Sequence, residues 1–175
     1  MIVLIPKENS KNEPRVSATP DTVKDLIKSG LTVHIESGAG TESFKSDDDY
    51  KQAGGVIIDS SKDIYSNVDI VLKVLAPSSE EIESLKDGST VISFCQTARE
   101  LDYVKALKEK SLTGFSMHLI PRTTLAQKMD ALSSQANISG YKSVLMAANR
   151  LGVYMPLLMT AAGTIRPAKV LIIGA

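Results

Sequence analysis

The sequence predicts an α/β protein built on a doubly wound, mostly parallel β-sheet. Short apolar runs alternate with helical patterns along the chain, and several of these runs are apolar on consecutive residues instead of alternate ones. Consecutive apolar residues are typical of strands covered on both faces, as in parallel sheets. A strand–helix–strand alternation then requires right-handed crossovers, which place helices on both sides of the sheet.

The strand candidates are short apolar runs that follow one another along the whole chain. Each is bounded by polar or turn-forming residues, as expected for strands of ordinary length. They are Ile2–Ile5, Leu31–Ile35, Val56–Ile58, Ile70–Val74, Val91–Cys95, Leu112–Met117 and Val170–Ile173.

The helix candidates fit between these strands. In the first of them Thr19 can cap the N-terminus, Pro20 suits the first turn, and Gly30 can end the helix. The remaining candidates carry apolar residues at helical spacing or acidic residues at their start. They are Asp47–Ala53, Ser79–Lys86, Glu100–Lys110 and Ile138–Leu151.

A polar, serine-rich stretch at Asp130–Asn137 predicts a domain boundary. We therefore expect an N-terminal lobe over residues 1–135 and a second region over residues 136–175, in which the long helix acts as a bridge. The last strand candidate runs directly into Gly174. An apolar strand ending in glycine is how a Rossmann dinucleotide fingerprint opens, although an ordinary strand followed by glycine gives the same pattern.

The composition excludes several classes of protein. Lys+Arg and Asp+Glu both number 20, so the formal net charge is +0, which argues against a nucleic-acid partner. One cysteine excludes an intrachain disulfide, and with two histidines it leaves no basis for a dedicated zinc site, so we expect no metal. We also expect neither a signal peptide nor a transmembrane segment in this chain.

One polar group of side chains precedes the long helix. Gln127, Asp130 and Ser133 are three residues apart, and Arg122 lies just ahead of them. On a helix, the three residues would share one face. Together the four offer a guanidinium donor, a carboxylate acceptor and two groups that both donate and accept, which is what a carboxamide such as that of nicotinamide needs. The alternative is an ordinary solvated surface helix.

Two further cations are candidate ligand-binding or structural residues. Arg15 lies in the polar loop after the first strand, where parallel sheets bind ligands, and could grip a carboxylate or phosphate with two hydrogen bonds. Lys73 stands inside an apolar strand, and a buried charge requires a partner. We therefore expect Lys73 to reach a ligand or an acid. The alternatives are a surface ion pair for Arg15 and a solvent-directed ammonium for Lys73.

Several of these segments together resemble the superfamily of alanine dehydrogenases and nicotinamide nucleotide transhydrogenases. The resemblance covers essentially the whole chain, and within the superfamily the segment from Pro121-Arg122 to Ser133-Ser134 is of the transhydrogenase type, similar to the NAD(H)-binding alpha subunit. The matching segments are Pro6-Lys7-Glu8, Asn12–Pro20, Glu36–Gly40, Ile70–Val74, Leu132–Tyr141, Met159–Thr164 and Ile173-Gly174-Ala175.

This resemblance implies a Rossmann- or flavodoxin-like lobe followed by a bridging helix and the first strand of a truncated NAD-binding Rossmann domain. It places Arg122, Gln127, Asp130 and Ser133 around the nicotinamide ring, with Asp130 holding Arg122, and makes Gly174 the first glycine of the cofactor-binding turn. It also implies direct hydride transfer between NAD(H) bound here and NADP(H) bound on a partner subunit, with no residue of this chain acting as acid or base.

The resemblance further implies partners and a location. The partners would be the beta subunit, with the NADP(H)-binding and membrane components that couple transfer to proton translocation, and a second alpha subunit in a homodimer. The chain would be a peripheral protein at the cytoplasmic face of the plasma membrane, and the 175-residue piece would be inactive alone.

Two alternative functions stay open at this point. One is an alanine dehydrogenase, in which residues matching Arg15 and Lys73 hold the substrate carboxylate and a catalytic histidine follows the fifth strand. Here that region reads Ser93-Phe94-Cys95-Gln96-Thr97, without a histidine, which counts against amino-acid oxidation. The other alternative is a folded lobe without catalytic activity.

Overall fold

The structure is a computed structural model that describes residues 1–59 and 62–174. It consists of two compact units, Met1–Ala126 and Gln127–Ala175, and each is described by itself. The expected division at residue 135 is not tested by this separation and stays a prediction.

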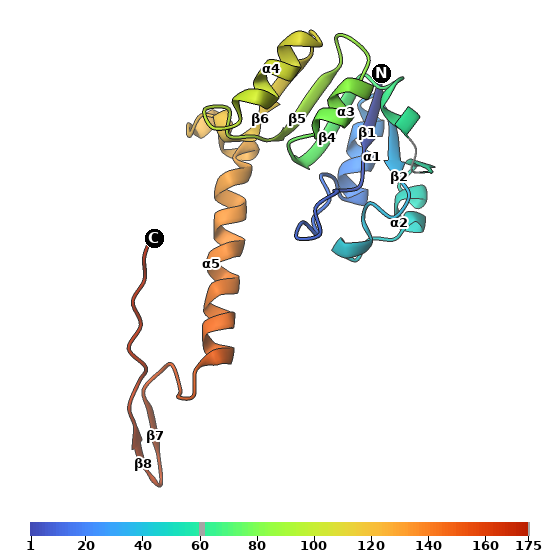
Figure 1. The fold of residues 1–175 in the computed structure, drawn as a ribbon. Helices are drawn as coiled ribbons and strands as arrows, with labels where there is room; N and C mark the ends of the chain where they lie inside the picture. The colour runs from blue at the N-terminus through green and yellow to red at the C-terminus, as the bar shows by residue number, and fades with distance from the viewer. Residues whose placement is uncertain (60–61, 175) are drawn as a thin grey trace. The chain divides into compact units, whose positions relative to one another are not determined.

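The first unit is a parallel sheet in which the strand order is β3-β2-β1-β4-β5-β6. Figure 1 shows it running from β2 through β1, β4 and β5 to β6. Every neighbouring pair is parallel, and the order is that of the Rossmann fold, so the predicted doubly wound sheet is confirmed. The strands are β1 (Ile2–Ile5), β2 (Thr32–Glu36), β3 (Val56–Ile58), β4 (Ile70–Leu75), β5 (Thr90–Phe94) and β6 (Thr113–Ser116).

The consecutive apolar residues of β1 serve two separate hydrophobic cores. Val3 and Ile5 belong to the core on one face of the sheet, with Val23 and Tyr50, whereas Leu4 belongs to the core on the other face, with Ile82 and Leu107. Because successive side chains of a strand point to opposite faces, only a strand that is apolar at every position can fill both cores.

Three helices of this unit begin at a side chain that caps the N-terminus. Thr19 accepts a hydrogen bond from the backbone of α1, while Ser46 and Ser78 form capping boxes with Asp49 and Glu81 at the start of α2 and α3. These caps fix where each of the three helices begins. The helices are α1 (Pro20–Lys28), α2 (Asp47–Gln52), α3 (Ser79–Ser84) and α4 (Leu101–Glu109), with short 3-10 helices at Thr41–Ser43, Lys62–Tyr65 and Met117–Leu119.

The second unit holds the helix α5 (Ala131–Arg150) and a hairpin of β7 (Leu158–Thr160) and β8 (Gly163–Ile165). The expected start of this helix at Ile138 is wrong, because Asp130 caps the helix by accepting a hydrogen bond from the Ser133 amide at 3.0 Å. The serine- and aspartate-rich stretch therefore forms the start of the helix and is not a linker. Both residue types are common at helix N-caps.

The expected strand at Val170–Ile173 is also absent. These residues have no strand partner among the described residues, and Leu171 and Ile173 are 85% and 91% exposed. A strand in a parallel sheet is stabilised by its neighbours, so an apolar run without a ladder stays extended coil. Ala175, the last landmark of the expected fingerprint, lies outside the described residues.

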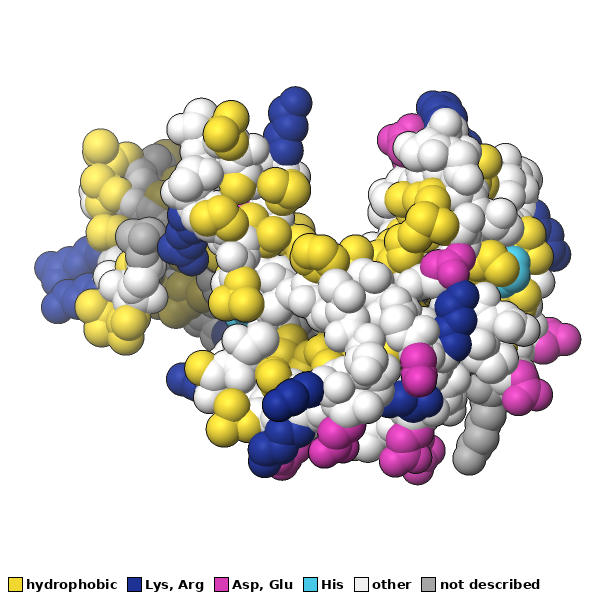
Figure 2. Space-filling view, turned by 90° about the horizontal axis from the view of Figure 1, so that it is seen from above, with side chains coloured by type: hydrophobic (Ala, Val, Ile, Leu, Met, Phe, Trp, Pro, Cys, Tyr) yellow, Lys and Arg dark blue, Asp and Glu magenta, His cyan; other side chains and the backbone are white. Residues whose placement is uncertain are grey.

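The charges on the molecular surface are mixed. Along the lower and right-hand parts of the view in Figure 2, Lys and Arg side chains lie next to Asp and Glu side chains. Among the described residues, no helix combines the length and the hydropathy needed to cross a bilayer.

Candidate functional site

The sheet topology places a crevice at the carboxyl ends of β1 and β4. The chain leaves β1 toward β2 on one side, while β4 continues toward β5 on the other, and β1 and β4 pair only at Val3 and Leu4. In open α/β sheets, ligands bind at this switch of strand order. A cavity of about 350 Å³ lies in the first unit between the loop after β1 and the segment after β2. It is lined by residues 7–11 and 13–15 of the loop after β1, together with Ala39 and Glu42.

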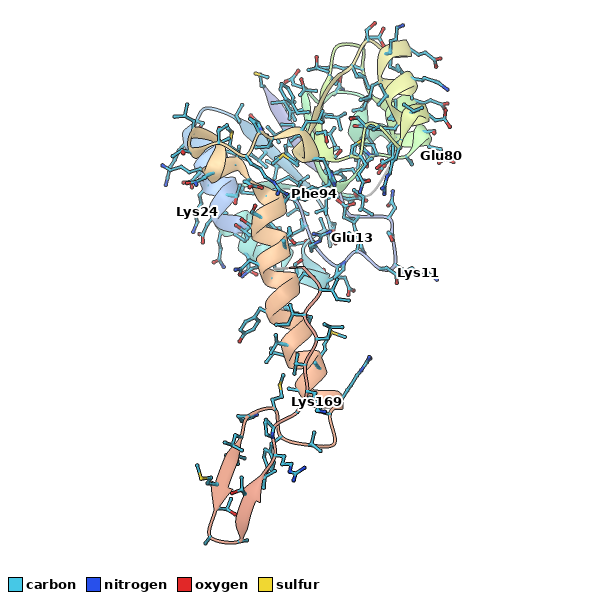
Figure 3. The ribbon with its side chains drawn as sticks, turned by 90° about the vertical axis from the view of Figure 1, so that its left-hand side faces the viewer. Lys11, Glu13, Lys24, Glu80, Phe94 and Lys169 are labelled. Atoms are coloured by element: carbon cyan, nitrogen blue, oxygen red, sulfur yellow. The ribbon has the colours of Figure 1, made fainter. Side chains whose placement is uncertain are left out.

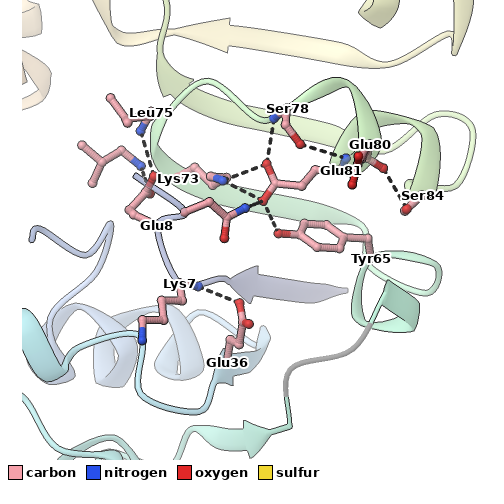
Figure 4. Close-up of polar contacts among 12 residues, drawn as sticks. Lys7, Glu8, Glu36, Tyr65, Lys73, Leu75, Ser78, Glu80, Glu81 and Ser84 are labelled. Carbon is pink, nitrogen blue, oxygen red and sulfur yellow. Dashed lines mark hydrogen bonds and ion pairs between the residues drawn. The ribbon is translucent and has the colours of Figure 1, made fainter. Parts of the chain in front are cut away.

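Lys73, in β4, is buried and paired with an acid, as expected. Its ammonium donates to both oxygens of Glu81 at 2.8 and 2.9 Å, and the two side chains are only 3% and 8% exposed (Figure 4). Glu81 stands in the first turn of α3, so the pair joins that helix to the sheet. This excludes the alternative of a solvent-directed lysine.

Glu81 collects hydrogen bonds from several parts of the lobe. Besides Lys73, its carboxylate accepts from the Tyr65 hydroxyl at 2.6 Å, the Asn9 amide at 3.0 Å and the Ser78 backbone at 2.7 Å. Burial by itself would raise the pKa of Glu81, but the bonds from Lys73 and Tyr65 outweigh burial and lower the pKa. Glu81 is therefore an ionised acid that connects the loop after β1 to β4 and α3.

Glu8, in the loop after β1, supplies a second buried carboxylate. It accepts hydrogen bonds from the backbone amides of Val74 at 2.6 Å and Leu75 at 3.3 Å, where β4 is no longer paired with β1. Burial raises the pKa of Glu8, although the Val74 amide and the nearby Lys73 charge oppose the increase. The crevice between the two strands is thus filled by a side chain of the protein itself.

Arg15 is paired with Glu13, two residues earlier in the same loop. Its Nε and Nη2 donate to the two carboxylate oxygens, each at 2.6 Å, and its guanidinium lies 6.0 Å from the centre of the Phe94 ring at the end of β5. The Arg15 side chain is 44% exposed and that of Glu13 is 8% exposed. Figure 3 shows Lys11 of this loop projecting outward from the lobe. The ion-pair alternative for Arg15 is therefore the observed arrangement.

The four residues expected around a nicotinamide ring fall in both units. Arg122 belongs to the first unit and is exposed, whereas Gln127, Asp130 and Ser133 belong to the second. Ser133 donates its hydroxyl to Asp130 at 2.6 Å, so these two side chains are in contact. The side chains of Arg122 and Gln127 are exposed, and among the described residues neither side chain has a hydrogen-bond or ion-pair partner.

The expected helical face of three residues does not form. Gln127 lies in a 3-10 helix, Thr124–Met129, and Asp130 is the cap that separates it from α5, where Ser133 lies. The backbone of Asp130 is not helical, because an N-cap residue places its side chain to accept a hydrogen bond from an amide in the first turn of the next helix. Gly174, the remaining expected cofactor residue, has φ of +83°, a conformation that glycine adopts readily.

Sequence reasoning missed the acids of this lobe. Glu81, Glu13 and Glu8 each bind a cation or a backbone amide near the crevice, but none was expected to do so. A signal existed for Glu81, because Ser78-x-x-Glu81 ahead of an apolar residue is a capping-box pattern that places the glutamate in a first helical turn. The contacts of Glu8 and Glu13 depend on loop geometry, which the sequence pattern does not specify.

The residues after β5 and β6 complete the carboxyl edge of the sheet. Cys95 is 1% exposed and fills the core, and burial raises the pKa of its thiol to about 11. His118 follows β6 and meets the edge of Phe94, with ring centres 5.6 Å apart. Among the described residues, no group of three or more histidines, cysteines or acids is arranged to hold a metal ion.

Comparison with known proteins supplies the family. The model of the alanine dehydrogenase/PNT N-terminal domain matches residues 4–139. The chain belongs to this family. It is 43% identical over 170 residues to the NAD(P) transhydrogenase subunit alpha of Cereibacter sphaeroides, covering 97% of this chain and 32% of the relative. It is 33% identical over 179 residues to the alanine dehydrogenase of Staphylococcus saprophyticus, covering 99% of this chain and 47% of that enzyme.

A solved member of the family has the same fold. The crystal structure of transhydrogenase from Sinorhizobium meliloti matches with a TM-score of 0.90 and 39% identity, over 96% of this chain and 50% of that chain. The chain thus spans between about a third and a half of the length of these family members.

Proposed function

We propose that this chain is the NAD(H)-binding component of an NAD(P) transhydrogenase, in which a hydride passes between NAD(H) bound by this component and NADP(H) bound by a partner. The observation that carries the proposal is the 43% identity to a transhydrogenase alpha subunit, maintained over 97% of the chain. The alanine dehydrogenase relative is less similar, at 33% identity.

The residues after β5 support the same choice. Oxidation of an amino acid requires a side chain that accepts a proton, whereas direct hydride exchange between two nicotinamide rings does not. The position after β5 carries Cys95, whose raised pKa keeps it a neutral thiol, followed by Gln96, which does not titrate. Neither residue is suited to accept a proton at neutral pH.

The proposed roles of the site residues follow from their hydrogen-bonding groups. The side-chain amide of Gln127 can donate to and accept from a carboxamide at once, and Arg122 adds a guanidinium donor. Asp130 holds the hydroxyl of Ser133 at 2.6 Å, which fixes the position of that hydroxyl. Gly174 would let the backbone approach a pyrophosphate closely. The bound nucleotide supplies the hydride chemistry, and these residues supply its position.

The proposal includes the partners and the location of the complex. Hydride transfer requires the two reacting carbons at ~3–3.5 Å, so the nicotinamide face must stay open to an NADP(H)-binding component. Coupling to proton translocation belongs to a membrane component, and this chain would lie as a peripheral, homodimeric part on the cytoplasmic face of the plasma membrane.

A single substitution tests the proposed site in the intact enzyme that contains this chain. We expect Gln127→Ala to slow the single-turnover transfer of hydride by about tenfold or more, because a misplaced ring loses the reactive geometry, while NADH binding changes far less. Stopped-flow absorbance measures the transfer rate, and Gln52→Ala, an exposed glutamine at the end of α2, is the matched control. Equal transfer rates in the two variants would defeat the proposed role of Gln127.

The alternative activity is measured on the same protein. An alanine dehydrogenase would oxidise NADH in the presence of pyruvate and ammonia, whereas a transhydrogenase would reduce an NAD analogue with NADPH. Activity in the first assay alone would overturn the proposed function. A titration with NADH, in which nicotinamide fluorescence reports binding, tests the third alternative. A lobe without catalytic activity that binds no nucleotide would give no change in fluorescence, whereas either enzyme would.

A further inference from the structure

One aromatic side chain of the first unit projects from a strained backbone. Phe44 lies in the loop between β2 and α2 and is 95% exposed. Its φ of +58° and ψ of +34° are left-handed, a conformation that bulky residues adopt rarely and at a cost in stability. An asparagine or a glycine would remove both the strain and the exposed ring, so the stability of the lobe does not explain a phenylalanine at this position.

The loop around Phe44 is fixed by hydrogen bonds on both sides of the ring. Before it, Ser43 donates its hydroxyl to the Pro14 carbonyl of the loop after β1 at 2.7 Å. After it, the carboxylate of Asp47 accepts from the Ser37 hydroxyl at the start of the same loop at 2.8 Å. An aromatic ring on a fixed loop loses little conformational freedom when a partner covers it, which is the property of a preorganised interface anchor.

The position of the loop and its charges indicate the kind of partner. The loop follows the carboxyl end of β2, and parallel sheets bind their ligands at this edge. A hollow of about 460 Å³ beside the ring is lined by residues 41 and 44–49, which include three aspartates and one lysine. A protein surface that fits the ring and these charges has an apolar pocket with basic residues around it.

We propose that Phe44 anchors the NADP(H)-binding partner to this chain, with its ring in an apolar pocket of the partner and the exposed Asp48 and Asp49 facing basic residues around that pocket. The inference rests on the proposed function, because that partner has to reach a nucleotide at the carboxyl edge of the sheet to exchange a hydride with it. In this role Phe44 acts on the association of the two components and not on the transfer step.

The test is Phe44→Asn in the intact NAD(H)-binding component that contains this chain, because asparagine accepts left-handed geometry better than most residues. The rate of hydride transfer is measured against the concentration of the purified NADP(H)-binding component. We expect the half-saturating concentration to rise at least about tenfold, as for the loss of an interface anchor, with an unchanged rate at saturation. The melting temperature should rise by about 2–4 °C, because the backbone strain is relieved.

Ser111→Asn is the matched control. Ser111 also has a left-handed backbone, with φ of +54°, but it lies between α4 and β6, at the amino edge of the sheet. This variant should be stabilised in the same way, with an unchanged half-saturating concentration. Asp48→Asn removes one exposed charge beside the ring and should reduce the increase of the half-saturating concentration with salt.

Two kinetic results would overturn the inference: an unchanged half-saturating concentration in Phe44→Asn, or an equal increase in Ser111→Asn. A change in the sedimentation of the NAD(H)-binding component alone, with an unchanged half-saturating concentration, would assign Phe44 to a contact between two copies and would refute the inference as well. Failure of the proposed function is distinguishable, because the unaltered components would then exchange no hydride at any concentration. Exchange that Phe44→Asn leaves unaltered defeats the inference alone.

Discussion

Replacing Lys73 by methionine should destabilise the lobe strongly. The substitution shortens the side chain by only one atom but leaves Glu81, whose side chain is 8% exposed, without its counter-charge. Removing one partner of a buried ion pair costs about 3–5 kcal/mol. The lower value of about 3 kcal/mol applies because Glu81 keeps its hydrogen bonds from Tyr65, Asn9 and Ser78. With an m-value of roughly 2 kcal/mol/M, the midpoint of urea unfolding should fall by about 1.5 M.

The assay is urea unfolding followed by far-ultraviolet circular dichroism, with two comparison variants. Lys105→Met breaks an ion pair with Asp102 whose side chains are 68% and 98% exposed, and this should cost at most about 1 kcal/mol. The double variant Lys73→Met/Glu81→Gln removes both charges while the glutamine oxygen can still accept from Tyr65 and Asn9, and it should recover much of the loss. If Lys73→Met is no more destabilising than Lys105→Met, the argument from burial is wrong.

Three further predictions concern other parts of the chain. Because the pKa of Glu81 lies below its ordinary 4.5, ionised Glu81 stabilises the fold above about pH 4.5, and this stabilisation is lost as the pH falls through the folded pKa. Glu81→Gln should therefore reduce the fall in the free energy of unfolding at acid pH, and an unchanged fall would contradict this. Cys95, with a pKa of about 11, should react with a disulfide reagent at pH 8 only when urea unfolds the chain, and rapid reaction of the folded chain would oppose this. Gly40→Ala would place a Cβ 2.6 Å from the Tyr50 ring and should cost about 1–3 kcal/mol in thermal unfolding, whereas Gly140→Ala, with open space in α5, should stabilise by up to about 1 kcal/mol; equal melting temperatures would refute the packing argument.

The strands of the first unit could be predicted because they are buried on both faces. A run such as Ile2–Ile5 matches the observed β1 at both ends, since every position fills one of two cores. Helix caps could also be predicted from the sequence, as Thr19 and Pro20 show at the start of α1. The run Val170–Ile173 failed because a strand also needs neighbours, which an apolar pattern alone does not reveal.

The candidate site was predictable only in part. The need of Lys73 for an acid followed from the cost of burying a charge, but the identity of Glu81 depends on how α3 packs against β4. The predicted helical face at Gln127 failed because Asp130 uses its carboxylate to start α5, a choice that helical periodicity cannot indicate. Roles for Arg122 and Gln127 in cofactor binding stay predictions.

The order of the strands in the sheet has a consequence for synthesis on the ribosome. The first strand to be made, β1, is also a central one, and β2 and β3 then extend the sheet on one side before β4, β5 and β6 extend it on the other. Each strand thus joins an edge that already exists, and none has to be inserted between two earlier ones. The nascent chain can build this sheet outward in both directions without ever reopening a pair it has formed.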